Sequence, residues 1–404
     1  MNDNDITDTA HEAPTRRDTI KYGGAVIGGG LLTGCAGESG PSGGANGSNS
    51  SGNRNTTTDS GESPYSVTIE PAGKITFEDV PETWTTFGGA WAEMAAVLGN
   101  ADGARAIQAY LPPEVYLDAA GLSIDRNLPT FFGDQGIDKE LFYDLDSDVH
   151  FIDPNMLLSL DDSWDRSDVE EISKNIGPVC GNNCRRRREF HTGYPLYTLY
   201  EAFEKAALVF KEYDRYEALK QVHDEVMKDV ESRIPPKSDR PSVGLLNGGS
   251  EPRNNDFSPM NTEGDGYEMK TYRDLGTPSA FTAEQSEGDA DYELLLQVDP
   301  DVLIVHWAIG RFDSTGEFES QFIQPMRDHP VGEKLTAVQE ERVYPGAGGE
   351  QGPVTNLFQT ELTARQVYPE KFGEFQGIEA QPDIPADERL FDRQRVADII
   401  NGQF

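Results

Sequence analysis

The sequence has few basic residues, and this shortage excludes one class of partner. Lysine and arginine together number 34 against 71 aspartates and glutamates, which gives a formal net charge of -37 at pH 7. A field of this sign repels phosphate groups, so nucleic acids and anionic membrane surfaces are not expected as partners. The acidic residues are spread along the whole chain, which is typical of adaptation to high salt, where ions screen their mutual repulsion.

Motifs of common enzyme classes are also missing. There is no phosphate loop of the Gly-x4-Gly-Lys-Ser/Thr type and no His-Glu-x-x-His zinc motif. The 6 histidines are scattered, and only His306 follows an expected strand at a place where a ligand could be contacted. Beyond the N-terminus, no apolar run is as long as a bilayer span. The sequence therefore predicts a protein that is not an enzyme and needs no cofactor.

The N-terminal residues have the composition of an export signal followed by a tether. Arg16 and Arg17 precede a short Gly-rich apolar segment, and Leu32-Thr33-Gly34-Cys35 follows it. We expect residues 1–35 to be a twin-arginine lipoprotein signal, with Cys35 as the lipidated residue. Residues 36–64 are mostly Gly, Ser, Asn and Thr, a composition that cannot bury a core. We therefore expect a flexible tether that holds a globular body at the outer face of the cytoplasmic membrane.

The rest of the chain alternates short apolar strands with amphipathic helices. Residues 84–87 read as a strand that runs into Gly88-Gly89 and then a helix, and 242–249 repeat the strand and the glycine turn. This alternation predicts an α/β fold with parallel, Rossmann-like sheets. We also expect an antiparallel hairpin over 66–77.

One long helical segment separates the two halves. Residues 196–234 contain no Gly or Pro, and their apolar residues recur every three or four positions. We expect a break near residues 212–215, with Asp214 capping a second helix of roughly 28 Å. This predicts an N-terminal lobe over 65–212, an inter-lobe helix over 213–236 and a C-terminal lobe over 237–404. A cleft open to solvent should lie between two halves held apart by this single connector.

The two halves share one pattern. Glu140–Ile152 and Glu293–Val305 align without a gap, and each reads as a helix, a turn containing aspartate, and a buried strand. Each lobe is therefore expected to carry one copy of a helix-turn-strand unit.

The order and spacing of these pieces resemble the solute-binding components of ABC importers of the ferric-siderophore and cobalamin type. The likeness covers roughly residues 74–375 and includes WAEMAAVLG at 91–99 and the closing stretch AVQEERVYPGAGGEQGPVTNLFQTELTARQVYPEKFGE at 337–374. The resemblance implies two lobes joined by one long helix. It also implies a monomer whose partners are an ABC permease with its ATPase and a small-molecule metal chelate, with a ferric siderophore as the first choice of cargo.

In this family a surface glutamate of each lobe lies seven residues before a proline and docks onto arginines of the permease. The matching residues here are Glu140, where Ser147 replaces the proline, and Glu293, where Pro300 is retained. Either carboxylate could instead serve only to stabilise the N-terminus of its helix.

Other functions stay open. The same scaffold could carry cobalamin, haem or a molybdate-like oxyanion. A metal chelatase built on two similar lobes would be an enzyme of another class, and a structural protein of the cell surface would bind no small molecule.

Ligands of such folds bind where the carboxyl ends of the strands meet. The cleft residues that we expect there are Thr86, Phe87, Asp153, Asn155, Trp164, Arg185, Arg186, Arg187, Arg188, Tyr194, Asn247, His306, Trp307, Arg311 and Tyr344. Trp164 and Trp307 are attractive because indole rings grip flat ligands, although core packing would explain each equally well.

Four consecutive arginines, Arg185 to Arg188, stand out in so acidic a chain. They would form an anion trap if they pair with ligand oxygens through charge-assisted hydrogen bonds, or a solvated surface run if they do not. Cys180 and Cys184 lie just before them, and in an exported protein a disulfide between them is the default. Together with His191 they fall short of a four-ligand zinc site, so no metal is expected.

Overall fold

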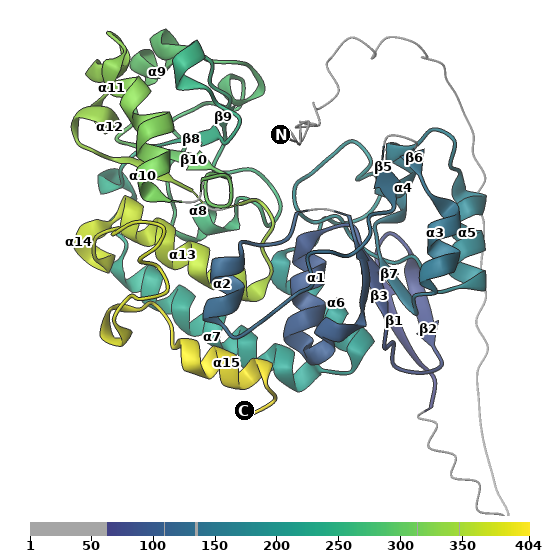
Figure 1. The fold of residues 1–404 in the computed structure, drawn as a ribbon. Helices are drawn as coiled ribbons and strands as arrows, with labels where there is room; N and C mark the ends of the chain where they lie inside the picture. Colours follow the sequence, from purple (N-terminus) through teal and green to yellow (C-terminus); the bar gives the residue numbers. More distant parts are fainter. Residues whose placement is uncertain (1–62, 109, 134–135, 313, 347) are drawn as a thin grey trace, which may run out of the picture. The chain divides into compact units, whose positions relative to one another are not determined.

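The computed structural model describes residues 63–108, 110–133, 136–312, 314–346 and 348–404 (Figure 1). The expected signal peptide, Cys35 and all of the expected tether except its last two residues lie outside the described residues. Within the described ranges, no helix is both long and apolar enough to cross a bilayer.

The N-terminal lobe is built on a parallel sheet of order β4-β3-β7, with β3 at its centre. The expected hairpin is present as antiparallel β1 and β2, which pair Val67 with Ile75. The strands are β1 (Tyr65–Ile69), β2 (Gly73–Phe77), β3 (Trp84–Thr86), β4 (Ala104–Ile107), β5 (Phe132–Gly133), β6 (Gly136–Ile137) and β7 (Val149–Phe151). The helices are α1 (Gly89–Ala95), α2 (Glu114–Ala119), α3 (Lys139–Leu145), α4 (Pro154–Leu160) and α5 (Arg166–Asn175).

The C-terminal lobe is built on a second sheet of order β11-β10-β8-β9, in which only β9 is antiparallel to its neighbour. Its strands are β8 (Val243–Asn247), β9 (Pro259–Met260), β10 (Val302–His306) and β11 (Val343–Pro345). The helices of this half are α8 (Lys270–Asp274), α9 (Tyr292–Val298), α10 (Thr315–Phe318), α11 (Gln324–Asp328), α12 (Thr336–Gln339), α13 (Pro353–Val367), α14 (Pro369–Phe372) and α15 (Arg393–Ile400). The predicted fold class, two α/β lobes with parallel sheets, is confirmed.

The long helical segment forms α6 (Leu199–Phe210) and α7 (Tyr213–Arg233), and α7 joins the two lobes as expected. The break between them lies at Lys211, whose backbone is left-handed with φ 55°. Asp214 lies in the first turn of α7, and the N-cap residue is Glu212, so the expected Asp214 cap is wrong. The helix ends because Lys211 leaves the right-handed region, which composition alone does not reveal.

The repeated pattern appears twice as the same local structure. Both α3 and α9 are 7 residues long and end at an aspartate with left-handed backbone, Asp146 with φ 45° and Asp299 with φ 41°. The aspartate two positions further on accepts hydrogen bonds from the backbone and hydroxyl of the residue that precedes the central strand. Asp148 does so from Thr83, and Asp301 does so from Ser242. Each lobe therefore contains one copy of the unit.

The two lobes share a hydrophobic core, and α7 is not their only connection. One cluster of buried side chains includes Trp84 of β3, Val243 of β8 and Leu357 of α13. Every residue of α13 is buried, and this helix packs on α1, α2 and α7 of the first part of the chain (Figure 1). The C-terminal α15 packs along α7. α7 is therefore not the single connector between the two lobes, because α13 also contacts α1, α2 and α6.

Candidate functional site

The carboxyl ends of the strands of both sheets lead into one contact region. A short additional strand segment places the arginines there: Val179 pairs with His150 of β7 in parallel, and the Cys180 N–H donates to the His150 carbonyl at 2.8 Å. The loop that follows contains Arg185, and its backbone meets the C-terminal lobe where the Tyr267 N–H donates to the Cys184 carbonyl at 3.0 Å.

A small cavity of about 60 Å³ lies in this region. Both lobes line it, with Phe87, Gly88, Trp91, Phe151, Asp153, Met156, Asn182, Asn183, Cys184 and Arg185 from one and Tyr267 and Glu350 from the other. Pockets for drug-sized ligands usually measure roughly 300–1,000 Å³. A large chelate therefore needs the surrounding side chains to move apart.

Two of the four arginines converge on one buried glutamate. Glu268 is only 1% exposed, and its Oε1 accepts hydrogen bonds from Arg185 at 2.8 Å and from Arg186 at 3.0 Å. The Arg186 Nε lies 2.6 Å from Oε2 of the same carboxylate. We call Arg185, Arg186, Glu268, His306 and Glu350 the ion-pair cluster. The sequence could not reveal which arginines face inward, and the structure points to the first two.

The other two arginines lie on the surface. Arg187 is exposed and pairs with the exposed Asp265 at 2.8 Å. Arg188 is exposed as well, and among the described residues its guanidinium has no hydrogen bond or ion pair. The interpretation of the run as a solvated surface therefore fits these two and fails for Arg185 and Arg186.

The pKa values of the two carboxylates of the ion-pair cluster are shifted in opposite directions. Burial raises the pKa of Glu268, but the charges of Arg185 and Arg186 and the contact with His306 outweigh it and hold that pKa well below its usual range. Burial raises the pKa of Glu350, and the charge of Arg185 and a hydrogen bond from Tyr267 only partly oppose it. Glu268 is thus the principal counter-charge of the arginines.

Aromatic rings cover one side of Arg185. Its guanidinium lies 4.8 Å from the ring centroid of Trp307, and the ring of Tyr110 meets Trp307 edge-on at 5.8 Å. Tyr110 is 77% exposed, which is unusual for a ring of this size. A Cβ at Gly349 would come within 2.6 Å of the Trp307 ring, so only glycine lets this loop lie against the indole. These rings form an accessible aromatic surface beside a cation.

His191 holds the arginine loop in place. Its Nδ1 accepts from the Arg188 N–H at 2.8 Å, and its Nε2 lies 2.8 Å from the Asn183 carbonyl, to which it can donate. Asp153 supports the same loop by accepting from the Asn183 N–H at 3.0 Å and from the Tyr194 hydroxyl at 2.8 Å. Burial raises the pKa of Asp153, against these hydrogen bonds.

The expected disulfide is not formed in the structure. Cys180 and Cys184 are both free and fully buried, and burial raises the pKa of each thiol. Cys180 is fixed beside β7 by its backbone hydrogen bond to His150, and the backbone of Cys184 is fixed against Tyr267. The two thiols act as small apolar core residues, because hydrogen bonds of the backbone, and not a cross-link, hold the loop.

Two predicted cleft aromatics lie away from the cavity. The Trp164 indole is buried among the apolar side chains under α3, donates to the Ile137 carbonyl at 3.3 Å and packs near Phe142. Tyr344 of β11 packs edge-on against Phe375. Core packing accounts for both rings.

Some of the polar residues predicted for the cleft bond elsewhere, and others reach the contact region. Thr86 is buried and hydrogen-bonds the Phe151 carbonyl, and Asn155 accepts from Arg166. Asn247 accepts from the N–H of Gly249, and Arg311 is exposed with its guanidinium 5.5 Å from the ring of Phe312. The structure brings Phe87, Asp153, Arg185, Arg186, Tyr194, His306 and Trp307 to the contact region.

Several residues of the contact region are not predicted from the sequence. Glu268, Tyr267 and Glu350 lie in loops without a recognisable motif, and Tyr110 lies in a stretch that predicts no regular structure. The sequence predicts a helix around Trp91 but not a role in the cavity, where its indole donates to the Asn182 carbonyl at 3.1 Å. No local pattern marks loop residues that meet only through the tertiary fold.

Two carboxylates form reciprocal caps between α1 and α13. Glu93 of α1 accepts hydrogen bonds from the N–H groups of Gly352, Val354 and Thr355 at the N-terminus of α13, at 3.0, 2.7 and 2.9 Å. Glu350, just before α13, accepts from the Ala90 N–H at the N-terminus of α1 at 3.3 Å. Both carboxylates are buried, and burial raises the pKa of Glu93. Each side chain therefore accepts hydrogen bonds from N–H groups at the start of the other helix, which have no partner within that helix.

The two candidate docking glutamates occupy equivalent positions. Glu140 and Glu293 are exposed, and each lies two residues after the aspartate that caps α3 or α9. Among the described residues, neither carboxylate makes a hydrogen bond or an ion pair.

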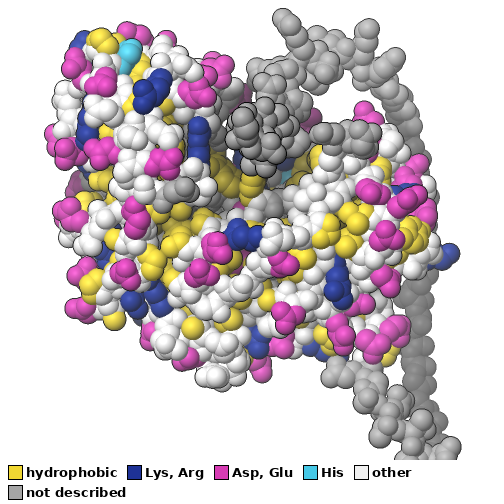
Figure 2. All heavy atoms as spheres, in the orientation of Figure 1, with side chains coloured by type: hydrophobic (Ala, Val, Ile, Leu, Met, Phe, Trp, Pro, Cys, Tyr) yellow, Lys and Arg dark blue, Asp and Glu magenta, His cyan; other side chains and the backbone are white. Residues whose placement is uncertain are grey.

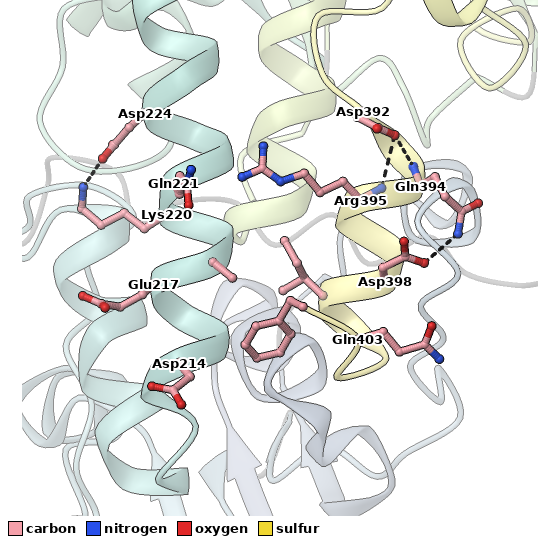
Figure 3. Close-up of a pocket in the computed structure, with 13 residues that line it drawn as sticks. Asp214, Glu217, Lys220, Gln221, Asp224, Asp392, Gln394, Arg395, Asp398 and Gln403 are labelled. Atoms are coloured by element: carbon pink, nitrogen blue, oxygen red, sulfur yellow. Dashed lines mark hydrogen bonds and ion pairs between the residues drawn. The ribbon is translucent and has the colours of Figure 1, made fainter.

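A larger hollow of about 970 Å³ lies elsewhere, between α7 and α15 (Figure 3). Its polar groups are mostly engaged locally: Lys220 pairs with Asp224, the Asp392 carboxylate caps α15, and Gln394 bonds Asp398. We do not assign this hollow as the ligand site, because its charges serve the helices that form it.

The sequence matches one known protein family. A family model described as periplasmic binding protein matches residues 89–346, which is more than half of the chain. No curated protein sequence matches it.

Three solved structures of similar fold come from bacteria. A periplasmic binding protein from Veillonella parvula is 11% identical with a TM-score of 0.52, over 76% of this chain and 92% of that one. The iron-uptake system-binding protein FeuA of Bacillus subtilis is 12% identical with a TM-score of 0.51, and the match covers 76% of this chain and 99% of FeuA. The iron uptake ABC transporter substrate-binding protein PiuA of Streptococcus pneumoniae is 16% identical with a TM-score of 0.50, over 74% and 98%.

Proposed function

The chain belongs to the periplasmic binding protein family, and from this we propose that it captures a ferric siderophore outside the cytoplasm and delivers it to the permease of an ABC importer. Members of this family are extracytoplasmic binding proteins, and the resemblance seen in the sequence is confirmed at this level. Two of the proteins with similar structures, PiuA and FeuA, are named as iron-uptake proteins, which supports an iron chelate as the cargo.

The observation that carries the proposal is the pairing of two inward-facing arginines with an aromatic surface. Arg185 and Arg186 supply guanidinium groups that bind carboxylate or catecholate oxygens in pairs. Trp307 and Tyr110 offer ring faces and edges for the flat, apolar parts of a chelate. An anionic iron chelate combines both features.

The acidic surface shapes how such a ligand arrives. Asp and Glu side chains are scattered over the face that Figure 2 shows, with few basic ones among them. Because long-range repulsion acts on any anion at low salt, capture depends on short-range contacts with the arginines. Binding should therefore strengthen, or at least hold, as ionic strength rises.

Delivery is assigned to the two exposed glutamates. Glu140 and Glu293 would dock onto the two permease halves, since they occupy matching positions on the two lobes and have no partner among the described residues. The lipid anchor at Cys35 would keep the protein near the permease.

The test is a titration followed by tryptophan fluorescence, because Trp307 lies against Arg185. An anionic ferric tris-catecholate, a neutral ferric trihydroxamate and cobalamin are compared with the wild type and with the Arg185→Gln/Arg186→Gln variant. The wild type should bind the anionic chelate most tightly. Loss of two charge-assisted hydrogen bonds of ~1.5 kcal/mol each should weaken that binding about a hundredfold.

Arg187→Gln/Arg188→Gln is the matched control, since it removes the same two charges from the exposed part of the same run. It should bind the anionic chelate within about twofold of the wild type. Tightest binding of cobalamin would overturn the choice of cargo, and chemical conversion of a chelate would indicate an enzyme. Circular dichroism verifies that each variant is folded.

A further inference from the structure

Glu268 occupies the arginine groups that an anionic ligand would use. Its carboxylate is 1% exposed, it accepts hydrogen bonds from Arg185 and Arg186, and the His306 Nε2 lies 3.4 Å from its Oε1. A free arginine pair would be available to a ligand at once, whereas this pair already holds an anion supplied by the protein.

The ion-pair cluster holds more donors than its carboxylates satisfy. The Nε atoms of Arg185 and Arg186 and the Nε2 of His306 are buried without a hydrogen bond, although each lies near a carboxylate. Glu350 cannot serve them fully, because its Oε2 accepts from Tyr267 at 2.8 Å and from Ala90. Buried donors without acceptors are costly. A ligand with several oxygens would satisfy more of these donors than one glutamate does.

Glu268 also joins the two lobes at this point. Its N–H donates to the Arg185 carbonyl at 3.1 Å, next to the bond between Tyr267 and Cys184. Tyr267 and Arg185 both line the cavity of about 60 Å³. A ligand that enters between the arginines must therefore take the place of this side chain.

We propose that Glu268 competes with the ligand: an anionic ligand binds Arg185 and Arg186 by displacing the Glu268 carboxylate. Glu268, which we call the competitor, therefore affects the affinity for a ligand according to the charge of that ligand. The inference rests on the proposed function, because it concerns how that site selects its ligand. A neutral ligand that displaced Glu268 would leave two desolvated guanidinium groups unpaired, a large penalty. A neutral ligand therefore binds without displacing Glu268, whereas the competitor lowers the affinity for every anion that binds the arginines.

The experiment compares Glu268→Gln with the wild type and with Glu263→Gln, which removes the same charge from an exposed site nearby in the sequence. Binding of the anionic ferric tris-catecholate and the neutral ferric trihydroxamate is measured by calorimetry at one ionic strength. Glu268→Gln should bind the anionic chelate at least tenfold more tightly, while its affinity for the neutral chelate changes less than twofold. Equal or weaker binding of the anionic chelate by Glu268→Gln would overturn the competitor.

Inorganic phosphate is the second probe, because it tests the competitor without assuming the cargo. Glu268→Gln should bind phosphate at least tenfold more tightly than the wild type and Glu263→Gln do, and Arg185→Gln/Arg186→Gln/Glu268→Gln should lose that gain. If no variant binds either chelate but the phosphate result holds, the siderophore proposal fails and the competitor stands. If the wild type binds the anionic chelate and Glu268→Gln gains affinity for neither anion, only the competitor fails.

Glu268→Asp covers the case in which Glu268→Gln does not fold. It keeps the charge but shortens the side chain by one methylene, which loosens its contact with the arginines. Its affinity for phosphate should rise above that of the wild type by severalfold. A residue with a purely structural role would lose stability without this gain in anion affinity, so an unchanged or lower affinity would refute the competitor.

Discussion

His150 makes the stability of the protein depend on pH, and the size of the effect follows from its surroundings. The ring is fully buried in β7, both nitrogens lack a hydrogen bond, and Phe142 packs edge-on against it at 5.3 Å. Burial lowers the pKa of His150 to about 4 from an ordinary value of 6.5, and the charge of Asp148 opposes this only weakly. The folded protein therefore keeps this ring neutral under conditions in which the unfolded chain protonates it.

The sign of the effect is fixed by which state binds the proton. Well above pH 6.5 both states are neutral at this ring, and its contribution to stability is constant. As the pH falls from 6.5 toward 4, only the unfolded state takes up the proton, so the free energy of unfolding decreases. The free energy of unfolding has decreased by about 2 kcal/mol at pH 5. The decrease approaches roughly 3 kcal/mol below pH 4, where both states bind the proton.

The assay is chemical denaturation of the wild type and of His150→Leu at pH 7, 6 and 5 and at constant salt. Leucine removes the proton site and the two unsatisfied nitrogens, so at pH 7 the variant should be within ~1 kcal/mol of the wild type. Between pH 7 and 5 the wild type should lose about 2 kcal/mol more than the variant. Because other titrating groups such as His223 are common to both proteins, they cancel in this difference. Parallel curves for the two proteins would refute the assignment.

Three further outcomes can be measured. Glu93→Ala removes the acceptor of three buried N–H groups at the start of α13. The free energy of unfolding, measured by urea denaturation, should therefore fall by ~3–5 kcal/mol. A loss below ~1 kcal/mol would mean that water replaces the carboxylate. Glu140→Ala combined with Glu293→Ala should leave chelate affinity unchanged and abolish uptake in cells that carry the matching permease, whereas reduced affinity would place these residues at the ligand. Cys180 and Cys184 should react with a thiol reagent only after unfolding, and a failure to react even in denaturant would indicate that they are oxidised to a disulfide.

The sequence predicted those parts of the fold that depend on local pattern. The helix-turn-strand repeat was visible because Glu140–Ile152 and Glu293–Val305 keep the same spacing, and the structure places Asp146 and Asp299 at identical turns. The hairpin and α7 were likewise visible from alternation and helical periodicity. The exact break before α7 was not, since Lys211 carries no sequence sign of a left-handed backbone.

The candidate site was only partly accessible to sequence reasoning. The arginine run drew attention by its contrast with an acidic chain, but the strand segment at Val179 that places it between the lobes is too short to show a pattern. Glu268 and Glu350 come from loops far along the chain, and only the packing of the two sheets brings them to Arg185. The roles of Trp164 and Cys184 depend on burial, since both side chains are enclosed by protein, and the sequence does not show which tryptophan or cysteine is buried.

The reciprocal caps between α1 and α13 have a consequence for how the protein responds to salt. Glu93 and Glu350 are enclosed by protein, so dissolved ions cannot reach them, and concentrated salt leaves this joint as strong as dilute buffer does. Surface ion pairs such as Arg187 with Asp265 fade under the same conditions. The contact between α1 and α13 should thus keep its strength over a wide range of salinity.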